Sequence, residues 1–318
     1  MTSEPKVFKR LTESDIVVEG EGTSERLRAA DPYLGQTIDG RYLITERLGE
    51  GGMGAVYVAE HLKLGKLVAL KTIHARFADE ATVSERFSRE AMAAGRLEHP
   101  HIASAMDYGT FEAGGAYLVM QLVRGPSVQQ VLETKGGLGW VRAASIGAQI
   151  ADALAAAADE GIVHRDLKPE NVLLEDRDGA EHARVLDFGV ARMPEVLAPI
   201  DAHVRGLTME GTVVGTPGYM APEQALGENL DARADLYALG ILLYEMTTGV
   251  ALFDEDQLSD IVRRQLSMRQ TPRLSEVSGD ASVPVVFQSL VDRLLSARPD
   301  DRPGSAREVR EALTDLLL

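Results

Sequence analysis

The sequence predicts an α+β protein in which strands come first and helices follow. Short runs between residues 42 and 71 are rich in Val, Ile and Tyr or alternate apolar with polar residues, as strands do. Later stretches, 141–160 and 236–246, are apolar over lengths typical of core-packed helices. With 318 residues, the chain is long enough for one large domain or for two packed lobes.

Composition excludes several classes of protein. There are no cysteines, so disulfides and thiolate metal sites are excluded. The formal charge of −16 argues against a nucleic-acid-binding surface. No uninterrupted apolar run approaches the roughly 18–20 residues of a membrane span, and the first thirty residues lack the apolar core of a secretory signal. We therefore expect a cytoplasmic chain without a membrane span, although a longer parent protein could be membrane-tethered.

Residues 1–35 are expected to form a disordered acidic leader, because they mix charges with Gly and Ser and show little periodicity. A short helix around 24–30 that packs on the domain is the alternative. Order should begin near Gly40, and residues 42–44 have the composition of a first strand.

A glycine-rich stretch follows, Leu48-Gly49-Glu50-Gly51-Gly52-Met53-Gly54. Dinucleotide-binding folds use the same glycine spacing, but they place a helix after the glycines. Here residues 55–59 alternate as a strand does. A strand, a glycine loop and a second strand suit a loop whose N–H groups close over phosphates, since glycine has no Cβ. The alternative is a glycine-rich hairpin turn that binds no ligand.

Side chains able to take part in catalysis are most closely spaced at 164–171, which read His-Arg-Asp-Leu-Lys-Pro-Glu-Asn. Within six residues this segment places a carboxylate (Asp166), an ammonium (Lys168) and an amide (Asn171). Two short strands that follow could bring a second carboxylate, Asp187, opposite Asn171. A candidate base, a cation and two hard oxygen ligands are what a Mg²⁺-dependent phosphoryl transfer requires.

Taken in order, these motifs resemble those of the eukaryotic-type serine/threonine protein kinases of bacteria. The resemblance also includes Val68-Ala69-Leu70-Lys71, Asp187-Phe188-Gly189 and a segment 215–223 that ends Ala-Pro-Glu. It covers about residues 36–315. The motifs follow one another in the family's order, each in a suitable local context, so the match is specific.

The resemblance implies the bilobal protein kinase fold. The N-lobe and hinge, 36–123, would hold a small antiparallel sheet and one regulatory helix, and the C-lobe, 124–318, would be larger and mainly helical. The implied activity is the ATP- and Mg²⁺-dependent transfer of the γ-phosphate to Ser or Thr hydroxyls of proteins, including autophosphorylation of the activation segment. Mn²⁺ is an alternative ion. The implied partners are ATP, protein substrates and a transient homodimer for autophosphorylation in trans.

By resemblance, Asp166 accepts or orients the substrate hydroxyl proton and Lys168 neutralises the γ-phosphate. Asn171 and Asp187 would hold Mg²⁺. Thr216 would contact Asp166 and Lys168, as in kinases directed to Ser and Thr. His164 is expected to pack against Phe188 rather than to act chemically.

The resemblance also implies that Lys71 contacts the α- and β-phosphates and pairs with Glu90 on a helix over 83–97. Met120 would line the back of the adenine pocket, and the hinge backbone would bind the base, so Gln121 is tolerated where the family often has Glu. The residues expected to bind ATP are Leu48, Gly49, Gly51, Gly54, Val56, Ala69, Lys71, Met120, Gln121, Val123 and Leu173.

Three further residues are expected to have structural roles in the C-lobe. Asp235, near the start of the 236–246 helix, would tie the backbone of the catalytic loop to that helix. Glu223, the last residue of the Ala-Pro-Glu segment, would form a buried pair with Arg302, and loss of one partner of such a pair is costly.

Regulation is inferred from Arg165, which in this family marks kinases whose activation segment is ordered by a phosphate. Arg165 and Arg192 could form a cationic pocket for that phosphate. We hypothesise that Thr208 is the main autophosphorylation site, with Thr212 as the second candidate. Glu210 would supply a weaker permanent anion, or would simply be a solvated surface acid.

The alternatives to an active protein kinase are a pseudokinase and a small-molecule phosphotransferase of related fold. A pseudokinase would lack one of the motif residues, but Lys71, Glu90, Asp166, Asn171 and Asp187 are all present. A small-molecule phosphotransferase of related fold would lack the Ala-Pro-Glu segment and its arginine partner, and both are present here.

Overall fold

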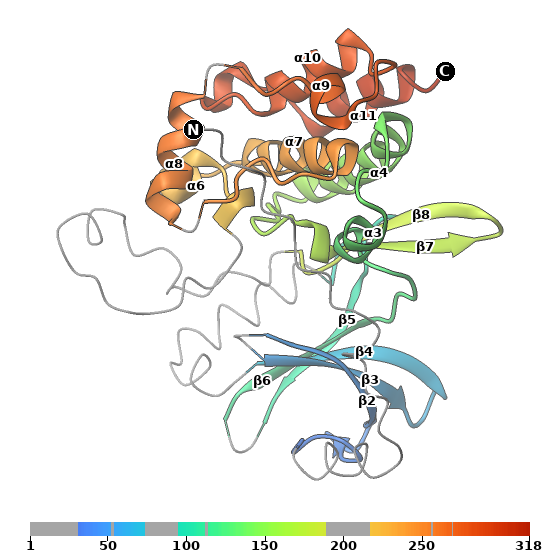
Figure 1. The fold of residues 1–318 in the computed structure, drawn as a ribbon. Helices are drawn as coiled ribbons and strands as arrows, with labels where there is room; N and C mark the ends of the chain where they lie inside the picture. The colour runs from blue at the N-terminus through green and yellow to red at the C-terminus, as the bar shows by residue number, and fades with distance from the viewer. Residues whose placement is uncertain are drawn as a thin grey trace, which may run out of the picture.

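The computed structural model describes seven ranges of the chain, namely 31–51, 54–73, 95–111, 114–188, 217–255, 257–268 and 270–318. Figure 1 shows two lobes, with a curved sheet at one end of the molecule and a packed group of helices at the other. A two-stranded hairpin and the segments around it lie between them. The bilobal α+β architecture expected from the sequence is confirmed.

The N-terminal lobe is built on a six-stranded antiparallel sheet in the order β1-β2-β3-β4-β6-β5. The strands around 42–44, 55–59, 68–71 and 119–121 fall where the sequence placed them, whereas β5 was not expected from its composition. The strands are β1 (Thr37–Ile38), β2 (Tyr42–Gly51), β3 (Gly54–His61), β4 (Lys66–Ile73), β5 (Ala105–Thr110) and β6 (Ala116–Gln121).

Because side chains alternate along a strand, the sheet has two apolar faces. Tyr57 and Leu70 belong to the core cluster on one face, whereas Ala69 and Met120 belong to the cluster on the other. Lys71 is two residues from Ala69 along β4, so it shares the second face.

The expected leader extends too far, because residues 31–35 are packed against the sheet. Tyr33 contacts the Tyr57 and Phe111 rings at centroid distances of 5.9 and 5.4 Å. Buried Asp31 accepts hydrogen bonds from the Tyr57 hydroxyl and from the Tyr33 N–H. Packing thus begins at least nine residues before Gly40, because the Tyr57 face of the sheet needs an apolar cover. The remainder of the leader, 1–30, lies outside the described residues.

The C-terminal lobe is mainly helical and is arranged around two helices that pack together, α4 and α7 (Figure 1). The described helices are α3 (Val128–Lys135), α4 (Trp140–Asp159), α6 (Pro222–Ala225), α7 (Arg233–Thr248), α8 (Leu258–Ser267), α9 (Leu274–Ser278), α10 (Val285–Leu294) and α11 (Ala306–Asp315).

Helix α7 is buried on nearly all sides, which explains why its sequence is apolar without a polar stripe. Helix α4 approaches it closely because small residues line the contact. A Cβ added at Gly147 would lie 2.5 Å from Leu243 Cδ2, so a larger residue here would require the Leu243 side chain to move. The closely packed pair provides the rigid base from which the catalytic loop, residues 162–171, emerges.

The hairpin between the lobes consists of β7 (Val172–Arg177) and β8 (Ala180–Val185). Strand β7 follows the catalytic loop through a 3₁₀ turn, Pro169–Asn171, and β8 leads into Asp187. The hairpin pairs Val172 with Val185, so the loop before one strand and the residue after the other meet at the same end.

Among the described ranges, no helix combines the length and apolar character needed to cross a membrane.

Candidate active site

The catalytic loop has an unusual backbone at Arg165, whose φ of 68° is in the left-handed region. A long side chain rarely adopts this conformation, so neighbouring groups must hold it there. Asp235 accepts hydrogen bonds from the N–H groups of His164 (2.7 Å) and Arg165 (2.8 Å). The Gln224 side chain donates to the carbonyl oxygen of Arg165 (2.8 Å). The strained residue is therefore held at its N–H and its carbonyl from two different helices.

The Asp235 carboxylate is almost fully buried, at 4% exposure. Burial raises the pKa of this carboxyl, and the two backbone N–H groups together with nearby His164 and Arg165 only partly oppose that effect. The anchoring expected of Asp235 is present.

Two side chains of the catalytic loop, Lys168 and Asn171, converge on the Asp166 carboxylate. Lys168 Nζ lies 3.1 Å from Asp166 Oδ2, and Asn171 Nδ2 donates to the same oxygen at 3.1 Å. Asn171 Nδ2 also donates to the Asp166 carbonyl oxygen at 2.7 Å. These contacts orient the carboxylate, while its exposure of 36% leaves it accessible to a substrate.

Lys71 reaches across from the sheet to Asp187, with 2.8 Å between Nζ and Oδ2. Asp187 has a left-handed backbone, with φ of 59°, which places it among the few described non-glycine residues in that region. Burial opposes ionisation of this carboxyl, but Lys71, with smaller contributions from His164 and Lys168, outweighs burial and holds its pKa below the ordinary value. The partner expected for Lys71, Glu90, lies outside the described residues.

The remaining oxygens of Asp187 and Asn171 fit a hard divalent cation. Asp187 Oδ1 is buried and has no hydrogen-bond partner in the part of the chain that the structure describes. Asn171 uses its amide nitrogen in both of its hydrogen bonds, which leaves its oxygen as an available acceptor. An unpaired carboxylate oxygen and an amide oxygen are ligands that Mg²⁺ accepts.

His164 is buried and packs against Phe188, as expected. Its ring meets the Phe188 ring edge-on at 4.7 Å, and its Nε2 lies 2.7 Å from the carbonyl oxygen of Leu186. These contacts connect the catalytic loop to the residues that precede and follow Asp187.

Glu223 and Arg302 form the buried ion pair that the sequence predicted. The two hydrogen bonds measure 2.6 and 2.8 Å, and the side chains are 6% and 0% exposed. Arg302 also donates to the carbonyl oxygens of Ser296, Ala297 and Arg233, and its guanidinium lies 4.9 Å from the centroid of the Tyr237 ring. Both charges are thus fully hydrogen-bonded, which offsets the cost of burying them.

Comparison with known proteins decides the family. The family model described as the protein kinase domain matches residues 42–314, which is most of the chain. The chain belongs to the protein kinase family.

Similar curated kinases come from Myxococcus and Mycobacterium. The chain is 40% identical over 285 residues to the serine/threonine-protein kinase pkn3 of Myxococcus xanthus, covering 89% of this chain and 51% of pkn3. It is 39% identical over 291 residues to the serine/threonine-protein kinase PknH of Mycobacterium bovis, covering 90% of this chain and 46% of PknH. The chain therefore spans about half the length of these relatives.

A solved kinase domain has the same fold. The crystal structure of the Mycobacterium tuberculosis PknI kinase domain matches with a TM-score of 0.67 and 30% identity, covering 88% of this chain and 98% of that domain. The expected membership of the bacterial serine/threonine kinases is confirmed.

The residues predicted to bind adenine line one face of the kinase sheet. Ala69 and Met120 are paired across β4 and β6, and Val56 packs on their cluster. The N–H of Gln121 is occupied, because it donates to Ser104 at 3.0 Å. Val123 is buried just beyond the end of β6, where its backbone is outside the sheet. Among the predicted contacts, Leu173 on β7 is half-buried and belongs to the other lobe.

Of the three glycines of this loop that the structure describes, only Gly54 is required by packing. A Cβ at Gly54 would lie 1.8 Å from the Thr72 carbonyl oxygen, whereas Cβ atoms at Gly49 and Gly51 would meet nothing within 4 Å. Leu48 is half-exposed at 51%. Gly54 therefore lets β3 lie against β4 beside Lys71, and the open space over Gly49 and Gly51 suits a ligand approaching the backbone.

One contact of the kinase C-lobe was missed by the sequence analysis. The Tyr219 hydroxyl donates a short hydrogen bond to Glu245 of α7. Burial raises the pKa of both groups, and the charge of nearby Glu170 adds to that effect. No local pattern connects these residues, because they are 26 positions apart. The bond holds the segment before α6 against the central helix.

Several predicted residues lie outside the described residues. They belong to the segment after β4 or to the activation segment: Glu90, Arg192, Thr208, Glu210, Thr212 and Thr216. Their predicted roles stay predictions.

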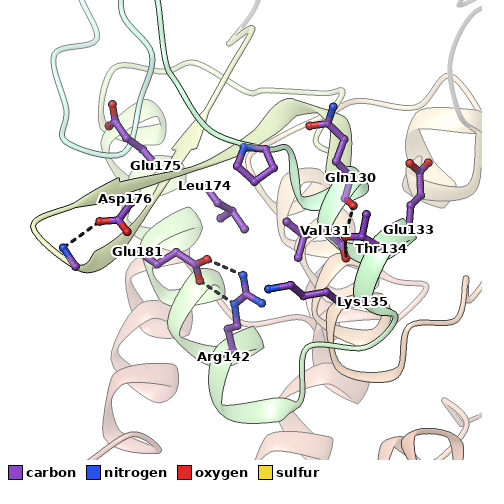
Figure 2. Close-up of a pocket in the computed structure, with 12 residues that line it drawn as sticks. Gln130, Val131, Glu133, Thr134, Lys135, Arg142, Leu174, Glu175, Asp176 and Glu181 are labelled. Atoms are coloured by element: carbon purple, nitrogen blue, oxygen red, sulfur yellow. Dashed lines mark hydrogen bonds and ion pairs between the residues drawn. The ribbon is translucent and has the colours of Figure 1, made fainter. Parts of the chain in front are cut away.

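A cavity of about 720 Å³ lies away from the catalytic loop, between α3 and the β7–β8 hairpin (Figure 2). Leu174 and Val131 form part of its apolar lining, and Arg142 binds Glu181 through two hydrogen bonds at its edge. It contains none of the residues predicted for ATP or metal binding, and its charged lining is mainly acidic, with four carboxylates and two basic groups.

Proposed function

We propose that this chain transfers the γ-phosphate of ATP to serine and threonine hydroxyls of proteins. The observation that carries the proposal is the Asp166 carboxylate, oriented by Lys168 and Asn171 and still accessible. Lys71 and Asp187 add a cation and a second carboxylate from the two lobes.

In the proposed reaction, the substrate hydroxyl oxygen bonds to the γ-phosphorus while the bond from that phosphorus to the bridging oxygen of ADP breaks. Asp166 accepts the hydroxyl proton, and Lys168 stabilises charge on the transferred phosphoryl group. Lys71 is the candidate for holding the other two phosphates. Its contact with Asp187 would then be exchanged, at least in part, for contacts with ATP.

The proposed metal is Mg²⁺, with Mn²⁺ as an alternative, held by Asn171 and Asp187. The free Asp187 Oδ1 supports this assignment. A divalent cation at this position would neutralise phosphate charge when ATP is bound.

A protein substrate is favoured over a small molecule by the Glu223–Arg302 pair. It anchors the Ala-Pro-Glu segment to the helical lobe beside α8, next to the end of the activation segment. In this proposal the segment supports a peptide-docking surface, and catalysis takes place in the cytoplasm, where ATP is available.

Autophosphorylation of the activation segment is part of the proposal, through a transient homodimer. Thr208 is the preferred site and Thr212 the second candidate, with Arg165 and Arg192 as the cations that receive the phosphate. Mass spectrometry of Thr208→Ala and Thr212→Ala after incubation with ATP distinguishes them. If Thr212→Ala alone loses the phosphate and the activation, the site is Thr212. If Glu210→Gln leaves the dephosphorylated enzyme unchanged, Glu210 is not a permanent anion.

The function is tested with the purified chain, Mg²⁺ and ATP labelled at the γ-phosphate. Three otherwise identical basic peptides should be supplied, with Ser, Thr or Tyr as the only acceptor. Label on the Ser and Thr peptides, with none for Asp166→Asn, is expected. Label on the Tyr peptide alone, or equal labelling by Asp166→Asn, would contradict the proposal.

A further inference from the structure

A short segment, residues 99–104, connects the two lobes by lying against β8. Ile102 forms a parallel β-bridge with Val185, the Ala103 N–H donates to the Val185 carbonyl (3.0 Å), and the Val185 N–H donates to the His101 carbonyl (2.9 Å). The segment then runs directly into β5 of the sheet. Its attachment to β8 is therefore one of the links between the sheet and the helical lobe.

Three histidine rings gather at this attachment, and we call them the histidine cluster: His99, His101 and His182. The His99 and His101 ring centroids are 5.7 Å apart, and the His101 and His182 rings are stacked at 6.0 Å with 20° between their planes. Nearly parallel rings do not direct their in-plane lone pairs toward one point, so the stack is not arranged to chelate a metal.

The hydrogen bonds of the cluster suit neutral rings. His101 Nδ1 lies 2.9 Å from the Ala183 carbonyl oxygen, so it carries the proton and donates. His99 Nδ1 accepts from the His101 N–H at 3.2 Å, so it must be unprotonated. His182 Nδ1 is buried with no hydrogen-bond partner among the described residues. A second proton on His99 would break its backbone contact.

The charges around the cluster only partly offset a positive ring. Asp152 of α4 lies 3.3 Å from His99 Nε2, but its other oxygen is bound by Arg310 of α11 at 2.7 Å. Arg184 of β8 donates to the Ile102 carbonyl at 3.1 Å, with Glu175 of β7 at 3.4 Å from its Nε. Just before the segment, Arg96 and Glu98 are exposed to solvent.

The ring at the centre is the one most affected by this environment. Burial lowers the pKa of His101, and the neighbouring His99 and His182 lower it further, against a smaller opposing effect of the Ala183 carbonyl and Asp152. A released His101 would return to the ordinary histidine value of about 6.5. The attached state thus binds this proton more weakly than the released state does.

We propose that the histidine cluster is a proton-sensitive latch that attaches residues 99–104 to β8 when neutral and releases them on protonation. The sign follows from linkage. Since the attached state has the lower proton affinity, attachment is strongest above about pH 6.5 and weakens as the pH falls below it. The latch itself does not depend on the proposed function. If that function holds, release also loosens the lobe junction and lowers transfer activity at acidic pH.

Amide hydrogen exchange of the full chain tests the latch without any catalysis. Exchange at Ala103 and Val185 should be followed from pH 7.5 to 5.5 and corrected for intrinsic rates. Each proton taken up on release lowers protection by about tenfold per pH unit. Because the released ring is already half-protonated at pH 6.5, we expect a loss of protection of up to about fivefold from pH 6.5 to 5.5, while amides of α7 keep theirs.

Two variants provide the comparison. In His101→Asn the side-chain amide can still donate to Ala183, but it cannot be protonated, so the pH dependence should largely disappear. His61→Asn is the matched control, since His61 contacts Tyr42 in the sheet and should leave the loss unchanged. Flat protection in the wild type, or an undiminished loss in His101→Asn, would overturn the proposal.

A second measurement uses no variant. Ring-proton NMR of the folded wild type should show His101 titrating below the free value of about 6.5. Titration at or above that value would also overturn the latch, even if His101→Asn failed to fold.

Discussion

The buried charged groups of the helical lobe and the charged groups of the active site are stabilised in different ways. Asp235, Glu223 and Arg302 are nearly inaccessible, and their partners are backbone groups or each other. Lys71 and Asp187 are each about one-fifth exposed and bind one another across the lobes.

The difference in burial separates the charged groups that stabilise the fold from those that take part in the proposed reaction. A buried polar group needs a permanent partner, because leaving it unpaired costs free energy. A partly exposed ion pair at the mouth of a site can exchange its partner for ATP or a metal ion at less cost. Variants in the two groups should therefore affect different quantities, stability in one and rate in the other.

The largest effect is expected at Asp166. Asp166→Asn keeps the size of the side chain but removes the base, so phosphate transfer should fall by about 10²–10⁴-fold. The thermal unfolding midpoint and ATP affinity should change little. Half the wild-type rate of autophosphorylation would show that Asp166 is not the base.

Removing the buried arginine should affect stability instead. Arg302→Ala leaves Glu223 as an unpaired buried charge, which should lower the free energy of unfolding by about 3–5 kcal/mol. Urea unfolding of the purified chain measures this change. If the denaturation midpoint matched that of the wild type, Glu223 and Arg302 would not be a desolvated pair in solution.

Asp235→Asn should have an intermediate effect on stability and should also reduce the rate. Asparagine offers one acceptor where Asp235 provides two, so one backbone N–H of the catalytic loop is left unpaired, at about 1–3 kcal/mol. Burial raises the pKa of Asp235, so the folded chain binds this proton more tightly than the unfolded chain does. The free energy of unfolding therefore includes a contribution from Asp235 that is present below about pH 4 and is lost as the pH rises. The variant should lack that component when unfolding free energy is measured against pH. An unchanged rate and stability would contradict the anchoring role.

The smallest effect is expected for an exposed pair of the same type as the buried one. Arg293 binds Glu308 at 3.0 Å, and both side chains are about half exposed. Arg293→Ala should cost at most about 1 kcal/mol and leave activity unchanged. A loss as large as that of Arg302→Ala would mean that burial does not distinguish the two pairs.

Much of the fold and of the candidate site could be predicted from local sequence. The alternation of β3 after the glycine loop, the apolar run of β4 and the length of α4 are short-range patterns, and the structure confirms them. Residues 31–35 could not be predicted to pack, because their role depends on the exposed aromatic face of a sheet formed later in the chain.

By itself, the sequence determined which chemical groups are present and the order in which they occur. Asp166, Lys168 and Asn171 are close in sequence, so any loop that joins them places them near one another. Only the tertiary structure decided the long-range partners, such as Lys71 with Asp187 and Tyr219 with Glu245. With 33 Lys and Arg residues and 49 Asp and Glu residues, charge complementarity allows many pairings, and only the packing of α4, α7 and the sheet selects among them.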